Sequence, residues 1–484
     1  MCDRYRMCPT NSVAVDSEIV DGVAGQLYRD APTSPIEPSV GGQVRRPVAI
    51  DLFSGAGGLS LGFEAAGFDV VAAVEYDPVH AATHLHNFPL TDVLCRDIKT
   101  VGGAELLRSA RRGWELHHPG REWDGVVDAI VGGPSCQGFS RMGKQDKNDD
   151  RNQLIMEFVR LVEEVRPKTF CMENVQGFLD PMFERLRSTA LSRLRKAGYS
   201  ISGEARALKA EEFGVPQKRR RVFILGFLGA VAPNEPIPTH STPVTVADAF
   251  AGLPIVEVGQ SSLNSDVVLL DESEALALDA AANDYLSAAG IRGNGGTSFG
   301  HRRIIDNERL AGCRVTVHQA ASIARFAATA QGEKEPISRY YRLSEVKPAL
   351  TLRAGTGTER GAFSAARPLH PTEPRVITVR EAARLHSFPD WFHFHVTNWH
   401  GHRQIGNAVP PLLAAAAARS LLQTLGLTPV QSTRAPVSLG DESLLSLNAT
   451  EAGARLKAKA GQLPGKRVRE STITENVHSE LAPV

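Results

Sequence analysis

The sequence predicts an α/β protein: a doubly wound, mostly parallel sheet with a smaller inserted domain. Between residues 48 and 227, short apolar runs alternate with amphipathic helical stretches, which is typical of βαβ units. Glycine-rich turns follow two of the apolar runs, as expected for loops at one edge of such a sheet. Near residue 229 the alternation ends in a proline-rich connector, which indicates a second unit.

The elements follow in order along the chain. Strands are expected within 48–53, 69–77, 128–133, 169–175 and 220–227. Helices are expected within 59–67, 78–88, 152–167 and 181–198. Two further helical stretches, 379–388 and 410–426, lie far downstream, and a proline pair suits the start of the second.

Composition excludes several classes of protein. The 484 residues are 42% hydrophobic and 22% charged, which fits an ordinary globular protein with a sizeable core. Acidic and basic residues balance at 54 each, so a case for nucleic-acid binding must rest on local charge. Six cysteines are scattered without a CxxC pattern, so no zinc–thiolate site or other metal centre is expected. With no signal peptide and no long apolar run, we expect a cytoplasmic protein in a reducing compartment.

Charge and composition divide the chain into five parts. Residues 1–46 are expected to be a disordered leader and 430–484 a disordered tail, since both are polar and without period. Residues 47–239 form the main α/β domain, 240–375 an inserted domain, and 376–429 a segment that returns to the main domain. Residues 301–384 hold 15 Arg or Lys against 8 Asp or Glu. This excess predicts a basic face on the inserted domain, although a mixed, solvated surface would account for it equally well.

The first motif is a glycine-rich turn between the first strand and first helix, Asp51 to Gly58. Glycines there let the backbone approach a ligand at a helix N-terminus. Glu75 ends the next strand, where a carboxylate can bind both ribose hydroxyls of an adenosine-type cofactor. The spacing is not GxGxxG, which argues against a nicotinamide cofactor.

Three further motifs follow strand ends. Cys136 lies in the glycine-lined loop GGPSCQGFS after an apolar strand, where doubly wound folds place their active sites. Glu173 ends the strand TFCMENV, and a buried glutamate there needs a partner. In the run QKRRR, Gln217, Arg219 and Arg221 alternate and so share one face of an entering strand.

These motifs, in this order, resemble the cytosine-5 DNA methyltransferase family over residues 47–425. DLFSGAGG is similar to the family's cofactor turn, Pro-Ser-Cys-Gln to its nucleophile loop, and MENV to its Glu-Asn-Val motif. The runs RVITVREAARLHSFPD and QIGNAVPP are similar to its last two motifs. Ser135 stands where many members have a second proline, and His386 where many have glutamine.

The resemblance implies a Rossmann-like, S-adenosyl-L-methionine (AdoMet)-dependent methyltransferase domain with an inserted target-recognition domain at 240–375. It implies that the Cys136 thiolate attacks carbon 6 of a flipped-out cytosine, that Glu173 contacts N3, and that Arg219 and Arg221 hold the base and nearby phosphates. The residues it places at AdoMet are Asp51, Phe53, Ser54, Gly55, Gly57, Glu75, Asp97, Ile98, Pro134 and Asn407. It also implies duplex DNA as partner and a restriction endonuclease paired with the enzyme. We expect a monomer, which would suffice to methylate one strand at a time.

Three alternatives stay open at this point. One branch of the family methylates cytosine in tRNA, although the long insertion favours a duplex DNA sequence as target. A DNA-binding regulator without catalysis would not need Cys136, Glu173 and Arg219. A nicotinamide oxidoreductase would share the fold but lacks its glycine fingerprint.

Overall fold

The computed structural model describes residues 45–134, 153–203, 205–256, 265–281, 283–291, 298–355 and 367–457. Its centre is an eight-stranded sheet of order β3-β2-β1-β4-β5-β9-β6, with β7 paired to β9 off this path. The strands are β1 (Val48–Leu52), β2 (Asp69–Glu75), β3 (Asp92–Cys95), β4 (Ala129–Gly132), β5 (Thr169–Val175), β6 (Tyr199–Ile201), β7 (Ala207–Lys209) and β9 (Arg220–Leu228). β1 to β5 are parallel, and β9 runs antiparallel to β5, β6 and β7. The predicted α/β class with a mostly parallel sheet is therefore confirmed.

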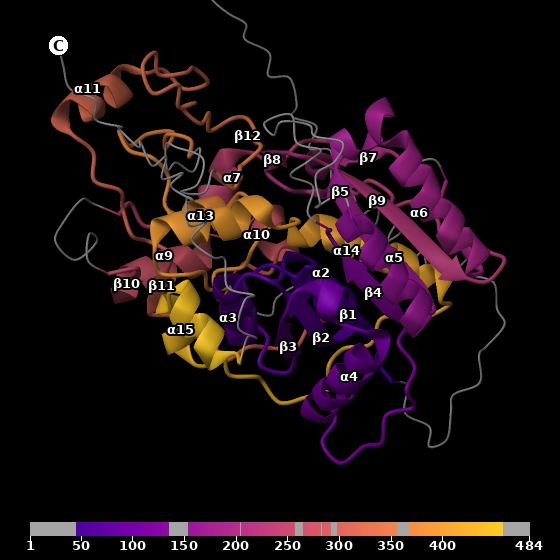
Figure 1. Cartoon of the computed structure of the whole chain (residues 1–484). Coiled ribbons are helices and arrows are strands. Elements are labelled where there is room, and N and C mark those ends of the chain that lie inside the picture. Colours follow the sequence, from indigo (N-terminus) through magenta and orange to yellow (C-terminus); the bar gives the residue numbers. More distant parts are fainter. Residues whose placement is uncertain are drawn as a thin grey trace, which may run out of the picture.

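Helices cover both faces of the sheet (Figure 1). The helices α4 (Gly103–His117), α5 (Gln153–Val165) and α6 (Glu184–Lys196) share one apolar core with the strands, which includes Leu106 and Phe158. On the other face, α2 (Gly58–Ala66) and α14 (Pro411–Thr424) share a second core that includes Phe63 and Leu413. The fold is therefore doubly wound.

The helix α14 reaches the sheet from the far end of the chain. A Cβ atom on Gly62 of α2 would lie 2.4 Å from the Cβ of Ala414, so only glycine permits this close packing. The stretch Asn398–Thr424 is long and apolar enough to cross a membrane by composition, but 78% of its apolar window is buried inside the fold. That burial is typical of a core helix.

Elements that the sequence analysis did not predict are short or strongly polar. β3 has four residues, three of them only half-buried, and α4 carries an exposed charged face, so neither has a clear apolar pattern.

The other helices in the described part of the chain are α3 (Pro78–Asn87), α7 (Val246–Phe250), α9 (Glu272–Ala280), α10 (Asp284–Ala288), α11 (Ala320–Ala328), α12 (Val379–Arg384), α13 (Asn398–Asn407) and α15 (Ala449–Arg455). Short 3₁₀ turns are η1 (Ile98–Thr100), η3 (Gln176–Leu179), η4 (Pro181–Phe183), η5 (Ala210–Phe213) and η7 (Glu442–Ser446). Two small sheets pair β10 (Val267–Leu269) with β11 (Arg309–Ala311), and β12 (Ala349–Leu350) with β8 (Gln217–Lys218).

The region 240–375 shares its main core with the rest of the chain. Val246, Leu343 and Leu352 belong to the same apolar cluster as Ala56 and Phe88 of the main domain. Smaller clusters, such as the one around Leu278 and Leu310, lie within the region itself. In Figure 1, α11 stands away from the central sheet at the upper left. The sequence boundaries at 240 and 375 therefore do not separate two independent cores.

Both terminal boundaries need correction. Residues 430–457 were expected to be disordered, but η7 and α15 fold onto α3, where Leu444, Leu445 and Ala452 are buried. At the other end, Arg46 was assigned to the disordered leader, yet its Nε lies 2.7 Å from the buried Asp69 carboxylate. Residues 430–457 hold 11 hydrophobic residues in 28, but these follow no clear period and are interrupted by Gly, Pro and polar residues, so the sequence suggested disorder. The rest of both tails lies outside the described residues.

Candidate active site

The turn after β1 has a backbone that only certain residues allow. Gly55 and Gly57 have φ values of 56° and 110°, and Phe53 also lies in the left-handed region at 59°. A Cβ atom on Gly57 would lie 2.3 Å from Cε2 of Phe88, so glycine is required there, whereas a Cβ on Gly55 would meet nothing within 4 Å. The backbone at Gly55 is therefore open to a ligand at the start of α2.

Glu75, at the carboxyl end of β2, fastens this turn. Its Oε2 accepts from the backbone N of Gly55 and its Oε1 from that of Asp77, each at 2.8 Å. Burial raises the pKa of Glu75. Each carboxylate oxygen keeps a second lone pair, so the group can still accept from two hydroxyls of a ligand.

Tyr76, the next residue, was missed by the sequence analysis. Its side chain is 44% exposed, which is unusual for an aromatic residue between two buried elements. Burial and the charges of Asp97 and Asp77 raise its pKa. An aromatic residue directly after the strand-ending glutamate was the available signal.

The other expected cofactor residues lie along the same sheet edge, because the carboxyl ends of parallel strands meet there. Asp97 follows β3 and caps η1 by accepting from the backbone N of Lys99 at 3.0 Å. Ile98 is buried beside it, and Ser54 is buried in the turn. Pro134 follows β4, the neighbour of β1.

Asp51, in β1, holds the start of α2 in place next to the turn. It is fully buried, and its Oδ2 accepts from the Ser60 hydroxyl at 2.6 Å and from the Ser60 backbone N at 3.1 Å. Burial raises its pKa to about 7. These hydrogen bonds join β1 to the first turn of α2.

Glu173 lies on β5 beside the entrance to the Pro-Ser-Cys-Gln loop. β4 and β5 are parallel neighbours, with Gly132 opposite Met172. A Cβ atom on Gly133 would lie 2.8 Å from the Glu173 Oε2, so the loop backbone passes directly against the carboxylate. Asn174 adds a hydrogen bond from its Nδ2 to the carbonyl oxygen of Pro134 at 3.4 Å.

Arg221 is a close cationic partner of the Glu173 carboxylate. The Nε of Arg221 lies 2.7 Å from its Oε1, and the two side chains are only 13% and 10% exposed. Burial raises the pKa of Glu173, and Arg221 and Arg219 offset this only in part. The site therefore favours a carboxyl group that takes up a proton and can donate it.

Cys136 lies outside the described residues. In the sequence it follows Pro134 by two residues. Cys95, Cys171 and Cys313 are all buried. Burial raises the pKa of Cys95 to about 12 and that of Cys171 well above its usual range, so neither thiol forms a thiolate readily.

Comparison with known proteins decides the family. The profile of the C-5 cytosine-specific DNA methylase family matches residues 48–423. This chain belongs to that family.

The methylase is 44% identical to the Type II methyltransferase M.XorII of Xanthomonas oryzae pv. oryzae, covering 84% of this chain and 92% of that protein. It is 33% identical to M1.HphI of Haemophilus parahaemolyticus, over 77% and 86% of the two chains. Among solved structures, a prophage-encoded DNA modification methyltransferase (E. coli) superposes with a TM-score of 0.63 at 34% identity. That match covers 78% of this chain and 99% of the other.

In this methylase, the two expected arginines have different surroundings. Arg219 is fully buried, and it donates to the carbonyl oxygens of Leu352 at 2.9 Å, Gly406 at 2.8 Å and Ala408 at 3.0 Å. Nη1 and Nη2 of Arg219 are turned to the backbone, and the expectation that Arg219 holds the base or a phosphate stays a prediction. Arg221, in contrast, points to Glu173.

Gln217 and His386 extend the contacts of Arg219. The Gln217 amide donates to the carbonyl oxygen of Leu385 at 3.1 Å and lies 3.0 Å from Nδ1 of His386, whose Nε2 lies 3.0 Å from the carbonyl oxygen of Ala408. Burial holds the pKa of His386 well below its usual range, so the ring is neutral. A neutral imidazole donates at one nitrogen and accepts at the other, which is how it can replace the glutamine common at this position.

Asn407 ends α13 and is exposed. The residues after it pack on the cofactor turn, since a Cβ atom on Gly58 would lie 2.4 Å from the carbonyl oxygen of Val409. The backbone at Asn407 therefore adjoins the start of α2. That its side chain contacts AdoMet stays a prediction.

The net positive charge of residues 301–384 is larger than the positive charge that they expose at the surface. Several of its arginines are buried and bind carboxylates or carbonyl oxygens within the fold: Arg303, Arg342, Arg375, Arg380 and Arg384. Exposed cations in the described part of this block include Lys347 and Arg353.

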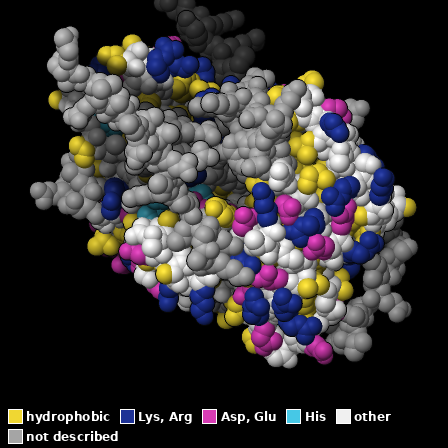
Figure 2. Space-filling view, in the orientation of Figure 1, with side chains coloured by type: hydrophobic (Ala, Val, Ile, Leu, Met, Phe, Trp, Pro, Cys, Tyr) yellow, Lys and Arg dark blue, Asp and Glu magenta, His cyan; other side chains and the backbone are white. Residues whose placement is uncertain are grey.

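The face formed by α4, α5 and α6 carries charges of both signs. Figure 2 shows basic and acidic side chains intermixed there. Arg193 and Glu163, for example, form an ion pair. That outer face therefore has no field of one sign to attract DNA.

Proposed function

We propose that this cytosine-5 DNA methyltransferase uses AdoMet to methylate carbon 5 of a cytosine flipped out of a specific duplex sequence. The observation that carries the proposal is the Glu173 carboxyl, which is buried, paired with Arg221 and in contact with the backbone at Gly133. This places a proton-holding group two strands from the cofactor turn and beside the loop that carries Cys136.

The residues present suit an adenosine-type cofactor. Glu75 offers two carboxylate oxygens for ribose hydroxyls, Tyr76 offers an exposed ring for stacking on a base, and Gly55 leaves open space beside the backbone. Asp97 and Pro134 border the same edge of the sheet. AdoMet bound there would supply the methyl group.

The chain's own residues carry the other steps. The Cys136 thiolate adds to carbon 6 of cytosine, which makes carbon 5 nucleophilic. Glu173 holds a proton at N3, where negative charge would otherwise develop, and Arg221 orients the Glu173 carboxyl. After carbon 5 has been methylated, loss of its proton and release of Cys136 restore the aromatic ring.

The names of the relatives support a place in a restriction–modification system. M.XorII and M1.HphI are both Type II methyltransferases, and the match spans most of each of them. We infer that the enzyme works as a cytoplasmic monomer on host DNA and protects it from a paired endonuclease.

Base-resolution sequencing of 5-methylcytosine in a host that expresses the chain tests this function. We expect methylation at one short sequence throughout the genome, and none there in cells that express Glu173→Ala. RNA from the same cells serves as the matched control. A host genome without new methylcytosine, or methylation confined to RNA, would contradict the proposal.

A further inference from the structure

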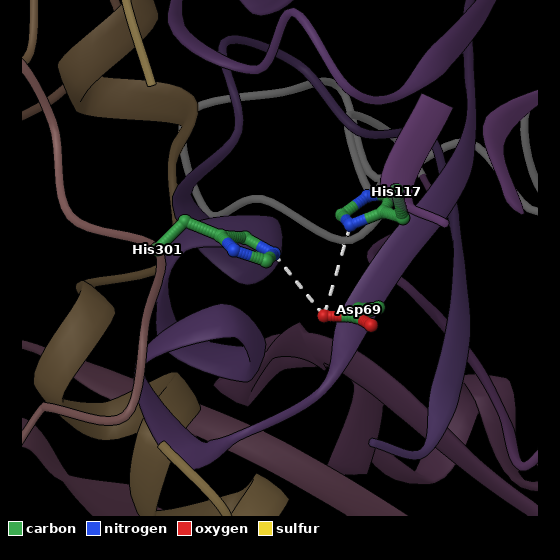
Figure 3. A group of neighbouring side chains, drawn as sticks. All are labelled: Asp69, His117 and His301. Atoms are coloured by element: carbon green, nitrogen blue, oxygen red, sulfur yellow. Dashed lines mark hydrogen bonds and ion pairs between the residues drawn. The ribbon is translucent and has the colours of Figure 1, made fainter. Parts of the chain in front are cut away.

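A second cluster of chemically active side chains lies at the opposite edge of the sheet. Asp69 is the first residue of β2, so it lies at the amino ends of the parallel strands, away from the catalytic loops. His117 ends α4, and His301 comes from the inserted region. Figure 3 shows both imidazole rings turned toward the same oxygen atom of Asp69.

The three side chains have the spacing of metal ligands. Their candidate ligand atoms all lie within 4.8 Å of one another. Oδ1 of Asp69 lies 3.1 Å from Nε2 of His301 and 3.7 Å from Nδ1 of His117. Ligands of a tetrahedral zinc ion with bonds of about 2.0–2.1 Å lie about 3.3 Å apart, between these two distances. The side chains are 0%, 4% and 2% exposed.

Hydrogen bonds orient both imidazoles for metal binding. His117 Nε2 lies 3.4 Å from the carbonyl oxygen of Val70, and His301 Nδ1 lies 2.8 Å from the Ser432 hydroxyl. Metal-bound histidines almost always donate their other ring N–H to such a group. With the proton on Nε2, Nδ1 of His117 directs a lone pair at the Asp69 oxygen, and it has no hydrogen-bond partner among the described residues. Two facing lone pairs are unfavourable unless a cation lies between them.

The charge around the cluster permits a cation. Arg46 lies 2.7 Å from Oδ1 of Asp69, His118 lies 2.9 Å from Oδ2, and nearby Arg303 and Glu64 form a separate ion pair at 3.0 Å. Arg46 therefore neutralises the carboxylate in part. Zinc sites built from three neutral histidines hold the ion with no carboxylate at all, so a partly neutralised carboxylate does not exclude zinc.

We propose that Asp69 Oδ1, His117 Nδ1 and His301 Nε2 bind one zinc ion and that water completes the four ligands. The ion fastens β2 and α4 to the inserted region. Ser432, which holds His301, and Arg434, which donates to the carbonyl oxygen of His117 at 2.7 Å, extend the connection to the C-terminal segment. The three ligands lie far apart in sequence, so no spacing motif could have revealed them.

Metal analysis of the untagged full-length protein tests the proposal. We expect about one zinc per chain after purification without chelator. After chelation, added Co²⁺ should give the visible absorption bands of a four-coordinate site, without the thiolate charge-transfer band that cysteine ligands would produce. Chelation should also lower the melting temperature of the wild type.

Two variants assign the ligands. His117→Gln and His301→Gln should lose the Co²⁺ bands, whereas the control His118→Gln should keep them, since His118 contacts only the other carboxylate oxygen. Folded wild-type protein that holds no zinc and gives no Co²⁺ bands would overturn the proposal, whatever the variants do. Bands that persist in His117→Gln would overturn it as well.

Discussion

Asp51 and Glu173 are buried carboxyl groups on neighbouring parts of one sheet, and their partners separate their roles. Among the described residues, Asp51 bonds to Ser60 through Oδ2 while its Oδ1 has no hydrogen-bond partner, whereas Glu173 lies against the loop that carries Cys136 and pairs with Arg221. A position at a strand end therefore does not by itself show what a carboxyl group does. Its hydrogen-bond and ion-pair partners indicate its role.

Asp51 gives a prediction about the pH dependence of stability. Its pKa rises from 3.8 to about 7 on folding, so the folded state binds the extra proton and stability falls as pH rises from about 4 to 7. Asp51→Asn removes this dependence while keeping an oxygen for Ser60. In urea unfolding, the free energy of unfolding of the variant relative to that of the wild type should increase by up to about 4 kcal/mol between about pH 4 and 7. It should not increase further above about pH 7. Parallel pH profiles of the two proteins would contradict the assignment.

Substitution of Arg219 should mainly lower stability, whereas substitution of Arg221 should mainly lower the methylation rate. Arg219→Ala removes the donors to the buried carbonyl oxygens of Leu352 and Gly406, while that of Ala408 keeps His386, and we expect a loss of at least about 2 kcal/mol in the free energy of unfolding. Arg221→Ala should cost no more than about 1 kcal/mol, because Glu173 can take up a proton when its partner is removed. Its methylation rate should fall sharply. Urea unfolding and single-turnover methylation of both variants check this, and equal losses of stability would contradict it.

At the scale of elements, the C-terminal segment shows where composition misleads. The apolar residues of 430–457 follow no clear period, yet η7 and α15 bury some of them against α3. Arg46 and His301 also depend on this segment, through the carbonyl oxygen of Val430 and the hydroxyl of Ser432. Small docked elements need few apolar residues, so their pattern is too weak to predict.

Truncation should distinguish the docked segment from the rest of the tail. A chain ending at residue 429 loses the buried Leu444 and Leu445, and we expect it to be less stable by about 3–6 kcal/mol. A chain ending at residue 457 is the matched control and should melt with the full-length protein. The measurement is the melting temperature together with urea unfolding. Equal stability of both truncated chains would show that the segment does not contribute.

Within the inserted region, buried and exposed cations should behave differently. Arg342 is buried and donates to the carbonyl oxygens of Pro371 at 2.9 Å and Thr372 at 2.7 Å, so Arg342→Ala should unfold more easily. Lys347 is exposed, and we expect Lys347→Ala to keep full stability. If Lys347 contacts a DNA phosphate as the exposed cations here should, its removal lowers the slope of log affinity against log salt by about 1. DNA titrations at several salt concentrations check this; an unchanged slope would exclude Lys347 from the interface.

At the scale of the whole molecule, the parallel strands, the two helix layers and the family were predictable from sequence. Each depends on local pattern, such as the apolar run before the cofactor turn or the alternation of Gln217, Arg219 and Arg221. Contacts between distant segments were not predictable. Arg219 meets carbonyl oxygens of residues 352, 406 and 408, and the inserted region shares a core with Ala56 and Phe88. The sequence pattern along the chain does not reveal contacts between such distant residues.

We propose that Cys136 attacks a flipped-out cytosine in DNA. The most direct measurement uses AdoMet and a duplex carrying 5-fluorocytosine at the methylated position. Fluorine cannot leave as a proton does, so the wild type should form a protein–DNA adduct that survives denaturation. Cys136→Ser should form none, while Cys171→Ser, whose thiol is buried in β5, should still form it. An adduct in Cys136→Ser, or none in the folded wild type, would contradict the account.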